Sequence, residues 1–228
     1  YGFHSLHGRA LPIAQGFKLA NKNMKVIAAG GDGDGFAIGT AHTIHAMRRN
    51  VDMTYVVMDN HIYGLTKGQA SPRSDLGSKT TTSPHGTIEN PISAIGLALA
   101  SGATFIAQTT SRDIKGAAEL IRQGMEHKGF AFINIFSPCV TYNPVNSYDW
   151  FAEHTKPLSE VEGYDPANKN HAYKALEDFE GLMTGLIYQD TTQKDYQAKL
   201  EHLTDAPLTE LSLELDPKIA NEWMKNYM

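Results

Sequence analysis

The chain has 228 residues, 41% hydrophobic and 20% charged, which is enough for one sizeable α/β domain with an extension or for two small domains. Its net charge of -5 and the lack of any basic run or basic aromatic stripe argue against a nucleic-acid-binding surface. No stretch approaches the roughly 18 apolar residues of a membrane helix, and no signal peptide is visible. A single cysteine excludes an internal disulfide. We therefore expect a cytoplasmic protein.

Apolar spacing predicts strands and helices in alternation over the first part of the chain. A helical stripe predicts a helix over 11–20, and a short, mostly apolar run predicts a buried strand over 24–29. The predicted elements that follow are a glycine-rich loop Gly30–Gly35, a helix Phe36–Arg49, a buried strand Met53–Met58, a long polar loop Asp59–Ser74, a helix Pro91–Ala100 with Asn90 as N-cap, a strand Thr104–Ala107, a helix Ser111–His127 with Ser111 as N-cap, and a strand Phe130–Phe136.

This alternation favours an α/β fold with a doubly wound, mostly parallel sheet. Ligands of such sheets bind at the carboxyl ends of the strands. The glycine-rich loop, the long polar loop and Ser137-Pro138-Cys139 each follow a predicted strand. We therefore expect these three segments to meet at one edge of the sheet.

The composition of the sequence changes after Asn146, where aromatic and charged residues become frequent. We divide the chain into a domain over 1–146 and a C-terminal extension over 147–228. The extension is predicted to be helical, with amphipathic helices over His171–Asp190 and Gln193–Leu200. We expect it to pack on the domain or on a partner.

A metal and diphosphate site is predicted where two of the loops meet. Asp32 stands between glycines after one strand and Asn60 follows the next strand, so a carboxylate and an amide oxygen can reach the same hard cation. Mg²⁺ takes six oxygens and commonly combines one carboxylate with ligand phosphates. The glycines let the backbone approach a diphosphate, and the helix beginning near Phe36 would direct its N–H groups at it.

Other glycine-loop sites fit this stretch less well. The dinucleotide fingerprint G-x-G-x-x-G fails because Phe36 and Ile38 stand where it needs its last glycine. The calcium loop D-x-[DN]-x-[DN]-G fails at Phe36 and Ala37. A plain strand-to-helix turn stays open for the glycine loop alone, but Asp59-Asn60 after the next strand favours the metal site.

These motifs resemble those of a known family. Gly31-Asp32-Gly33 followed by Asp59-Asn60 resembles the thiamine diphosphate motif, in which an asparagine follows a GDG. The wider sequence resembles the β subunit of 2-oxoacid:ferredoxin oxidoreductases over about residues 1–150, and only loosely beyond. The segments that carry the resemblance are His7-Gly8-Arg9, Gly30–Gly39, Arg48-Arg49-Asn50, Tyr63–Gln69, Ser71-Pro72 and Ser137–Thr141.

The resemblance implies a role for each matching position. Mg²⁺ would bind the carboxylate of Asp32, the amide oxygen of Asn60 and the backbone carbonyl of Ile62. The residues expected to line thiamine diphosphate are Gly31, Gly33, Asp34, Gly64, Leu65 and Thr66, with His7 near both cofactor and substrate. The catalytic candidates are His7, Arg9 and Lys67, the last two for a substrate carboxylate or phosphate.

The resemblance also implies that Cys139 is one of four ligands of a 4Fe-4S cluster. The other three would lie upstream of the His-Gly-Arg segment, and one thiolate cannot hold such a cluster. Because the chain opens on Tyr1 rather than on Met, we expect an upstream segment to be missing. Without the resemblance, a lone cysteine would be read as a small buried apolar residue.

Members of this family oxidise a 2-oxoacid with coenzyme A, release carbon dioxide and pass electrons through iron–sulfur chemistry to ferredoxin. The loop Gly64–Gln69 favours the 2-oxoglutarate branch over the pyruvate branch. The glutamate that activates the cofactor in related enzymes is expected on a partner α subunit, so this chain alone should be inactive. Two alternatives stay open: a thiamine-dependent decarboxylase or synthase without iron–sulfur chemistry, and a cofactor-binding module without turnover in this truncated form.

Overall fold

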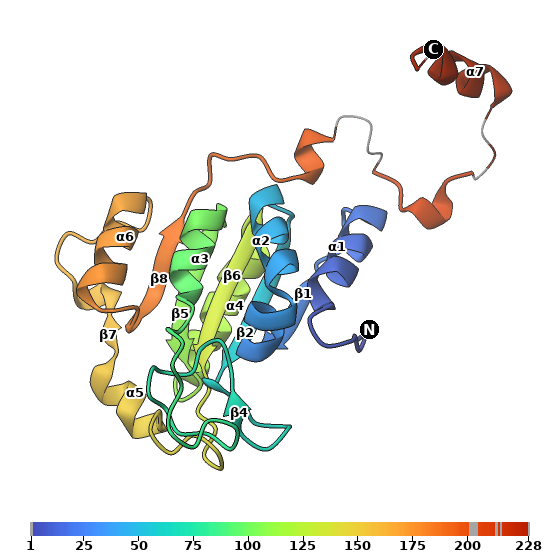
Figure 1. The fold of residues 1–228 in the computed structure, drawn as a ribbon. Helices are drawn as coiled ribbons and strands as arrows, with labels where there is room; N and C mark the ends of the chain where they lie inside the picture. The colour runs from blue at the N-terminus through green and yellow to red at the C-terminus, as the bar shows by residue number, and fades with distance from the viewer. Residues whose placement is uncertain (1, 201–204, 213, 215, 228) are drawn as a thin grey trace.

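A six-stranded sheet lies at the centre of the part that the computed structural model describes, residues 2–200, 205–212, 214 and 216–227 (Figure 1). Its first four strands are parallel, the fifth is antiparallel to the fourth, and the sixth is parallel to the fifth. In sheet order the strands are β1 (Ile27–Gly31), β2 (Met53–Asp59), β6 (Phe130–Phe136), β5 (Phe105–Thr110), β8 (Met183–Gln189) and β7 (Lys156–Pro157). The expected mostly parallel α/β sheet is confirmed.

Helices cover both faces of this sheet. One face carries α1 (Ala10–Ala20), α2 (Thr40–Arg49), α3 (Ala94–Ser101) and α6 (Lys169–Asp178), and the other carries α4 (Ile114–Glu126). The remaining elements are a π-helical turn η1 (Asp34–Ile38), a hairpin of β3 (Ile62–Tyr63) and β4 (Gln69–Ala70), helix α5 (Tyr148–His154), 3-10 turns η2 (Leu158–Glu160), η3 (Gln197–Lys199) and η4 (Leu208–Glu210), and helix α7 (Pro217–Lys225), which lies away from the sheet in Figure 1. Among the described residues, no helix is both long and apolar enough to cross a membrane.

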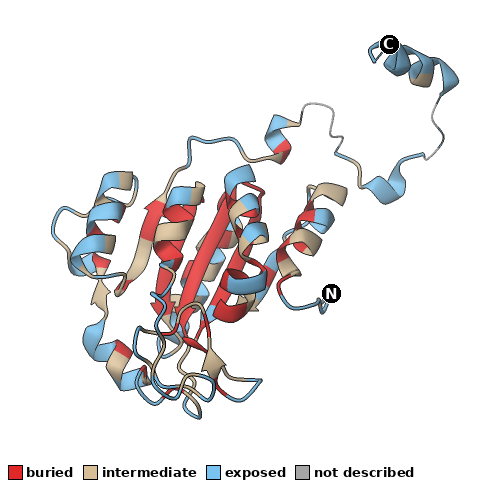
Figure 2. Cartoon of the chain, in the orientation of Figure 1, coloured by how far each residue is buried: buried red, intermediate tan, exposed pale blue. Residues whose placement is uncertain are grey.

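Strands β2 and β6 contribute much of the core because they are mostly apolar on both faces. Every residue of β6 is buried, as are all but one of β2. Such largely apolar runs suit a parallel strand that helices cover from both sides. Figure 2 shows the buried residues concentrated in the middle of the sheet, while the C-terminal segment is mostly exposed.

The strand registers bring the predicted loops to one edge of the sheet. Gly31, the last residue of β1, is level with Met58, and Asp59, the last residue of β2, is level with Phe136. The residues that follow these strand ends therefore start from neighbouring positions. The expected meeting of the three loops is confirmed.

The glycine-rich segment is not the loop that we predicted over Gly30–Gly35. The first strand is shifted towards the C-terminus of the predicted range Met24–Ala29, so that it ends at Gly31, and helical backbone begins at Asp32. The π-helical turn then leads into α2 with only Gly39 between them. The glycines thus form the start of a helix that points at the groove, rather than a loop ahead of it.

Two predicted helix starts lie too early in the chain. The N-caps are Ser93 and Asp113, whose side chains accept the N–H groups of Gly96 and Gly116 at 3.1 and 2.9 Å. Ser111 lies two residues before the cap of α4, and its N–H donates to the carbonyl of Phe136 at the end of β6. Ahead of α3, Ile92 is held by hydrogen bonds to Pro72 and Arg73.

The extension departs most from its prediction. The helix expected over His171–Asp190 ends at Asp178, and its second half is strand β8, antiparallel to β5. The helix stops because Glu180 and Gly181 adopt left-handed backbone, with φ of 51° and 80°. Only η3 is helical in the range Gln193–Leu200. Parts of the extension, at 201–204, 213, 215 and 228, lie outside the described residues, and its division from 1–146 stays a prediction.

Candidate functional site

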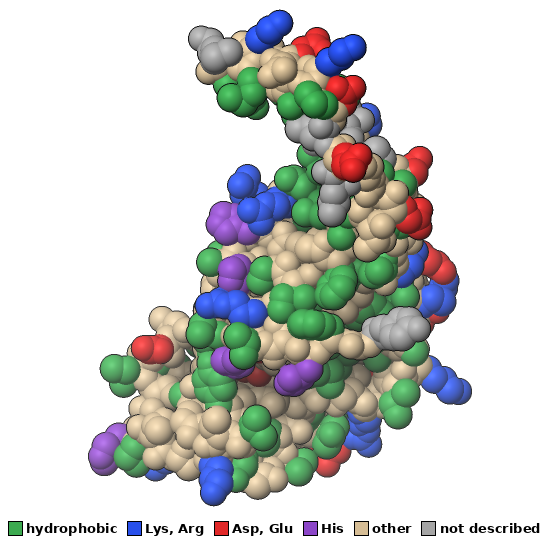
Figure 3. Space-filling model, turned by 90° about the vertical axis from the view of Figure 1, so that its right-hand side faces the viewer, with side chains coloured by type: hydrophobic (Ala, Val, Ile, Leu, Met, Phe, Trp, Pro, Cys, Tyr) green, Lys and Arg blue, Asp and Glu red, His purple; other side chains and the backbone are tan. Residues whose placement is uncertain are grey.

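An open groove with a volume of about 1560 Å³ runs along the β1 side of the molecule. Figure 3 looks onto this side, where hydrophobic side chains gather beside histidines and Lys or Arg side chains. The apolar end of the groove has exposed Phe3, Phe17, Met24 and Ile27. The predicted site residues that line the groove are His7, Gly31, Asp32, Gly33, Asp34, Asn60, Ile62, Gly64, Leu65 and Thr66.

Asp32 lines the groove and is only 1% exposed. Its Oδ2 accepts a hydrogen bond from Ser71 Oγ at 2.5 Å, and its Oδ1 accepts one from the Asn60 N–H at 3.4 Å. Burial, and then the nearby carboxylate of Asp59, raise the pKa of Asp32 to about 6. A bound cation stabilises the ionised form of a buried carboxyl group whose pKa is raised in this way.

The second half of the candidate metal site is a tight turn after β2. Asn60 Oδ1 accepts the N–H of Ile62 at 3.0 Å, and Asn60 O accepts from Asn143 Nδ2 at 3.2 Å. The carboxylate of Asp32, the amide of Asn60 and the carbonyl of Ile62 provide oxygen ligands of the kind that Mg²⁺ prefers. No group of three or more His, Cys, Asp or Glu side chains suited to a metal occurs in the described part, but a site with one carboxylate is not such a group.

The start of η1 offers backbone N–H groups to an anion in the groove. The first turn of a helix has N–H groups without partners inside the helix, and these bind phosphates readily. Gly33 allows a close approach here, because a Cβ at this position would overlap the ring of Tyr63. The hydroxyl of Tyr63 donates to the carbonyl of Gly33 at 3.1 Å, which holds the β3–β4 hairpin against the helix start.

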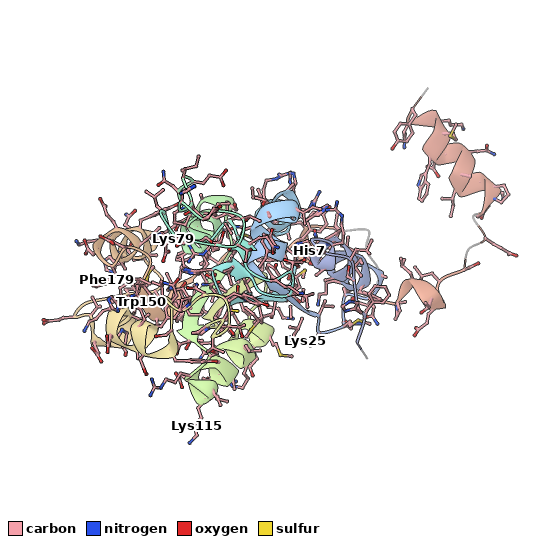
Figure 4. All side chains as sticks on the ribbon, turned by 60° about the horizontal axis from the view of Figure 1, so that its bottom comes forward. His7, Lys25, Lys79, Lys115, Trp150 and Phe179 are labelled. Atoms are coloured by element: carbon pink, nitrogen blue, oxygen red, sulfur yellow. The ribbon has the colours of Figure 1, made fainter. Side chains whose placement is uncertain are left out.

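The N-terminal segment is tied to this helix start through Asp34. Its Oδ1 accepts the N–H of Gly8 at 2.5 Å and lies 2.9 Å from Nδ1 of His7. Gly8 has a left-handed φ of 74° and lies against Ile38 and Gly39, so that no Cβ would fit. These contacts bring His7, which the sequence placed near the cofactor, to the groove, where Figure 4 labels it.

Two of the predicted catalytic residues lie outside the groove lining. Arg9 points to α2, where its Nη1 is 2.8 Å from Nε2 of His42. Lys67 is exposed in the turn of the β3–β4 hairpin and has a φ of 77°. Leu65, close to it in the same turn, is 99% exposed. The roles of Arg9 and Lys67 in binding a substrate stay predictions, since the structure does not bring them to Asp32.

Cys139 lies behind the hairpin rather than in the groove. It is a half-buried free thiol, and its Sγ would be 3.3 Å from a Cβ placed on Gly64. The only cysteine of the chain is thus in contact distance of the loop predicted to line the cofactor.

Sequence reasoning missed two side chains that contact the candidate metal site or its flanking residues. Ser71 donates to Asp32, and Arg73 binds Asp59 through its Nε at 3.0 Å. Both lie in the segment that we predicted as part of a polar loop. Ser71-Pro72 is among the segments that carry the family resemblance, but nothing in the sequence shows that its hydroxyl turns towards Asp32.

Comparison with known proteins places the chain in a family. Residues 1–135 match the family described as thiamine pyrophosphate enzyme, C-terminal TPP binding domain, and residues 139–205 match the C-terminal family of the pyruvate ferredoxin oxidoreductase beta subunit. The 2-oxoacid:ferredoxin oxidoreductase subunit beta of Saccharolobus solfataricus is 40% identical over 209 residues, which cover 87% of this chain and 68% of the relative. The chain belongs to the β subunits of the 2-oxoacid:ferredoxin oxidoreductases. The predicted family is thereby confirmed.

Other 2-oxoacid:ferredoxin oxidoreductase relatives carry 2-oxoglutarate in their names. The 2-oxoglutarate synthase subunit KorB of Methanocaldococcus jannaschii is 36% identical over 206 residues, which cover 89% of this chain and 74% of the relative. A solved 2-oxoglutarate:ferredoxin oxidoreductase from Magnetococcus marinus, with 2-oxoglutarate, coenzyme A and succinyl-CoA bound, is 39% identical with a TM-score of 0.87. That likeness covers 98% of this chain and 75% of the other chain, so it reaches further into the extension than the sequence suggested.

Proposed function

We propose that this β subunit holds thiamine diphosphate and Mg²⁺ in an enzyme that oxidises 2-oxoglutarate to an acyl-CoA and carbon dioxide and passes the electrons to ferredoxin. The observation that carries the proposal is the buried carboxylate of Asp32 beside Asn60, in a groove bordered by His7. The family and the names of the relatives support the same reaction. They do not favour a thiamine-dependent enzyme without iron–sulfur chemistry.

The residues present fit the cofactor and its metal. Asp32, Asn60 and the carbonyl of Ile62 would bind Mg²⁺, and the helix start at Gly31–Asp34 would bind the diphosphate. Gly64, Leu65 and Thr66 border the groove from the opposite side and would cover the rest of the cofactor. When bound, thiamine diphosphate supplies the electron sink for the loss of carbon dioxide.

His7 is suited to move a proton in the groove. Because Asp34 holds its Nδ1, the nitrogen that remains for proton exchange is Nε2. Its side chain is 55% exposed, so a substrate can reach it. Arg9 and Lys67 would bind the substrate carboxylates only if binding of the substrate or of the partner subunit moved their side chains into the groove.

Cys139 supports the redox part of the proposal. A cluster bound at this thiol would lie directly behind Gly64, close to the groove from which electrons must leave. The other three ligands of a 4Fe-4S cluster would come from outside this chain, and the α subunit would complete the active site. A chain whose single cysteine forms no internal disulfide is consistent with a reducing compartment, and we place the enzyme in the cytoplasm as part of the proposal.

The test uses the complete β subunit produced together with its α subunit. Viologen reduction is followed with Mg²⁺, thiamine diphosphate and coenzyme A, and with 2-oxoglutarate or pyruvate as substrate. We expect reduction with 2-oxoglutarate that depends on coenzyme A and disappears in Asp32→Ala. No reduction with any 2-oxoacid would refute the oxidoreductase, and a preference for pyruvate would refute the substrate.

A further inference from the structure

A cluster of charged side chains, formed by Asp59, His61, Arg73 and Asp75, lies directly behind the candidate metal site. Asp59 is fully buried at the end of β2. Its Oδ2 accepts hydrogen bonds from Arg73 Nε and Asn134 Nδ2, both at 3.0 Å. Its Oδ1 has no hydrogen-bond partner among the described residues and lies 3.6 Å from Nε2 of His61.

Arg73 contacts three residues in two segments through its guanidinium group. Besides Nε on Asp59, its Nη1 donates to the carbonyl of Ile92 at 2.5 Å and its Nη2 lies 3.2 Å from His61 Nε2. If Arg73 donates to that nitrogen, the His61 ring carries its proton on Nδ1, which faces Asp75 at 3.5 Å. The planar fork of an arginine spans these three partners, whereas the ammonium group of a lysine has three donors but is too compact to span them.

His61 is the residue between two of the candidate metal ligands, and its backbone is strained. Its φ is 60°, in the left-handed region that a residue with a side chain seldom adopts without support. The support comes from outside the turn, because Ser74 Oγ donates to the His61 carbonyl at 2.5 Å and Arg73 holds the ring. This conformation sets the directions of the Asn60 side chain and the Ile62 carbonyl.

The same segment reaches the other half of the site. Ser71 Oγ donates to Asp32 Oδ2 at 2.5 Å and accepts the N–H of Arg73 at 3.1 Å. The segment Ser71–Asp75 therefore contacts Asp32 on one side and the turn around His61 on the other. It is connected to both of the strand ends that provide the candidate ligands.

Behind the cluster is a second cavity of about 370 Å³, lined among others by His61, Arg73 and Trp150. Figure 4 labels Trp150, which lines this cavity, and His7, which lines the groove, at separate places, and no described residue lines both hollows. The cavity gives the His61 ring room to move if its contact with Arg73 is lost. The turn would then relax from its strained conformation.

We propose that Arg73 is a positioning residue for the metal site: through Asp59 and His61 it holds the turn 59–62 in the strained conformation that presents Asn60 and Ile62 to the cation bound by Asp32. The inference rests on the proposed function, because it assumes that a cation and its cofactor bind there. It predicts that Arg73 sets the affinity for Mg²⁺ without contacting the metal.

The experiment uses the complete β subunit with its α partner and measures thiamine diphosphate binding by calorimetry over a series of Mg²⁺ concentrations. The main variant is Asp59→Asn with Arg73→Gln, which removes both charges and so leaves no unpaired ion in the core. Arg73→Lys keeps the positive charge but loses the fork. Arg112→Gln, which removes an exposed pair with Asp149, is the matched control.

We expect the double variant to need about 10- to 100-fold more Mg²⁺ for binding, Arg73→Lys to show a smaller loss, and Arg112→Gln to match the wild type. The melting temperature without cofactor should be similar in Arg73→Lys and wild type, which separates positioning from a general loss of stability. Unchanged Mg²⁺ affinity in Arg73→Lys and in any folded double variant overturns the inference but leaves the proposed function intact. A wild-type enzyme that binds no thiamine diphosphate with Mg²⁺ overturns both.

Discussion

Replacing Asp32 by Asn should stabilise the protein without metal while abolishing its affinity for the cofactor. The pKa of this acid rises from 3.8 to about 6 in the folded state. A shift of that size corresponds to about 3 kcal/mol of unfavourable free energy for the ionised form at neutral pH. Because the folded-state pKa is raised, the native state holds the proton more tightly, so this cost appears as pH rises from below 4 to above 6.

The assay is urea unfolding without Mg²⁺ at acid and at slightly alkaline pH. At alkaline pH Asp32→Asn should raise the free energy of unfolding by up to about 3 kcal/mol, and below the unfolded-state pKa the gain should vanish. Asp149→Asn, at an exposed surface pair, serves as the control and should change stability by only a few tenths of a kcal/mol. With Mg²⁺ and thiamine diphosphate present, only the wild type should gain stability. A variant that is less stable than wild type at alkaline pH, or that still binds the cofactor, would refute the reasoning.

Three further predictions concern other parts of the structure. Gly33→Ala should displace the ring of Tyr63 and weaken thiamine diphosphate binding, measured by calorimetry, about tenfold or more. The double variant Gly33→Ala with Tyr63→Ala should recover part of this loss. Unchanged binding in the single variant would contradict the close approach at Gly33. Cys139→Ser in the complete α and β enzyme should lower the iron content and abolish viologen reduction while thiamine diphosphate still binds; full iron content would remove Cys139 from the ligand set. Asn50→Ala should lower the free energy of unfolding, measured with urea, by about 2 to 3 kcal/mol. The reason is that the buried Asn50 Oδ1 accepts the Phe130 N–H at 2.8 Å and that Asn50 has a left-handed φ of 54°. A loss below about 1 kcal/mol would show that another group replaces this hydrogen bond.

The sequence was sufficient to predict the meeting of Asp32 and Asn60. Each follows a strongly apolar strand, and in a parallel sheet such residues come to one edge whatever the packing details are. The pairing of Gly31 with Met58 and of Asp59 with Phe136 bears this out. Only the strands and their order were needed for this prediction.

The side chains that reach the site from loops could not be predicted in the same way. Arg73 and Ser71 lie in a segment without periodicity, and their partners are fixed by the path of the loop, which no local pattern describes. The strand β8 was taken for a helix because its apolar residues continue the stripe of α6. The break at Glu180 and Gly181 depends on a left-handed backbone, which glycine adopts readily but which the apolar spacing does not reveal.

The parallel sheet also has a consequence for when the site can form during folding. The hydrogen bond between Asn134 and Asp59 joins residues 75 positions apart, and neighbouring parallel strands here are joined by long crossovers. Contacts between distant parts of a chain form slowly, because the intervening loop must be closed first. The turn that carries Asn60 is therefore completed only after β6 has emerged from the ribosome and docked beside β2. Thiamine diphosphate and Mg²⁺ would accordingly bind only after this long-range strand pairing has formed.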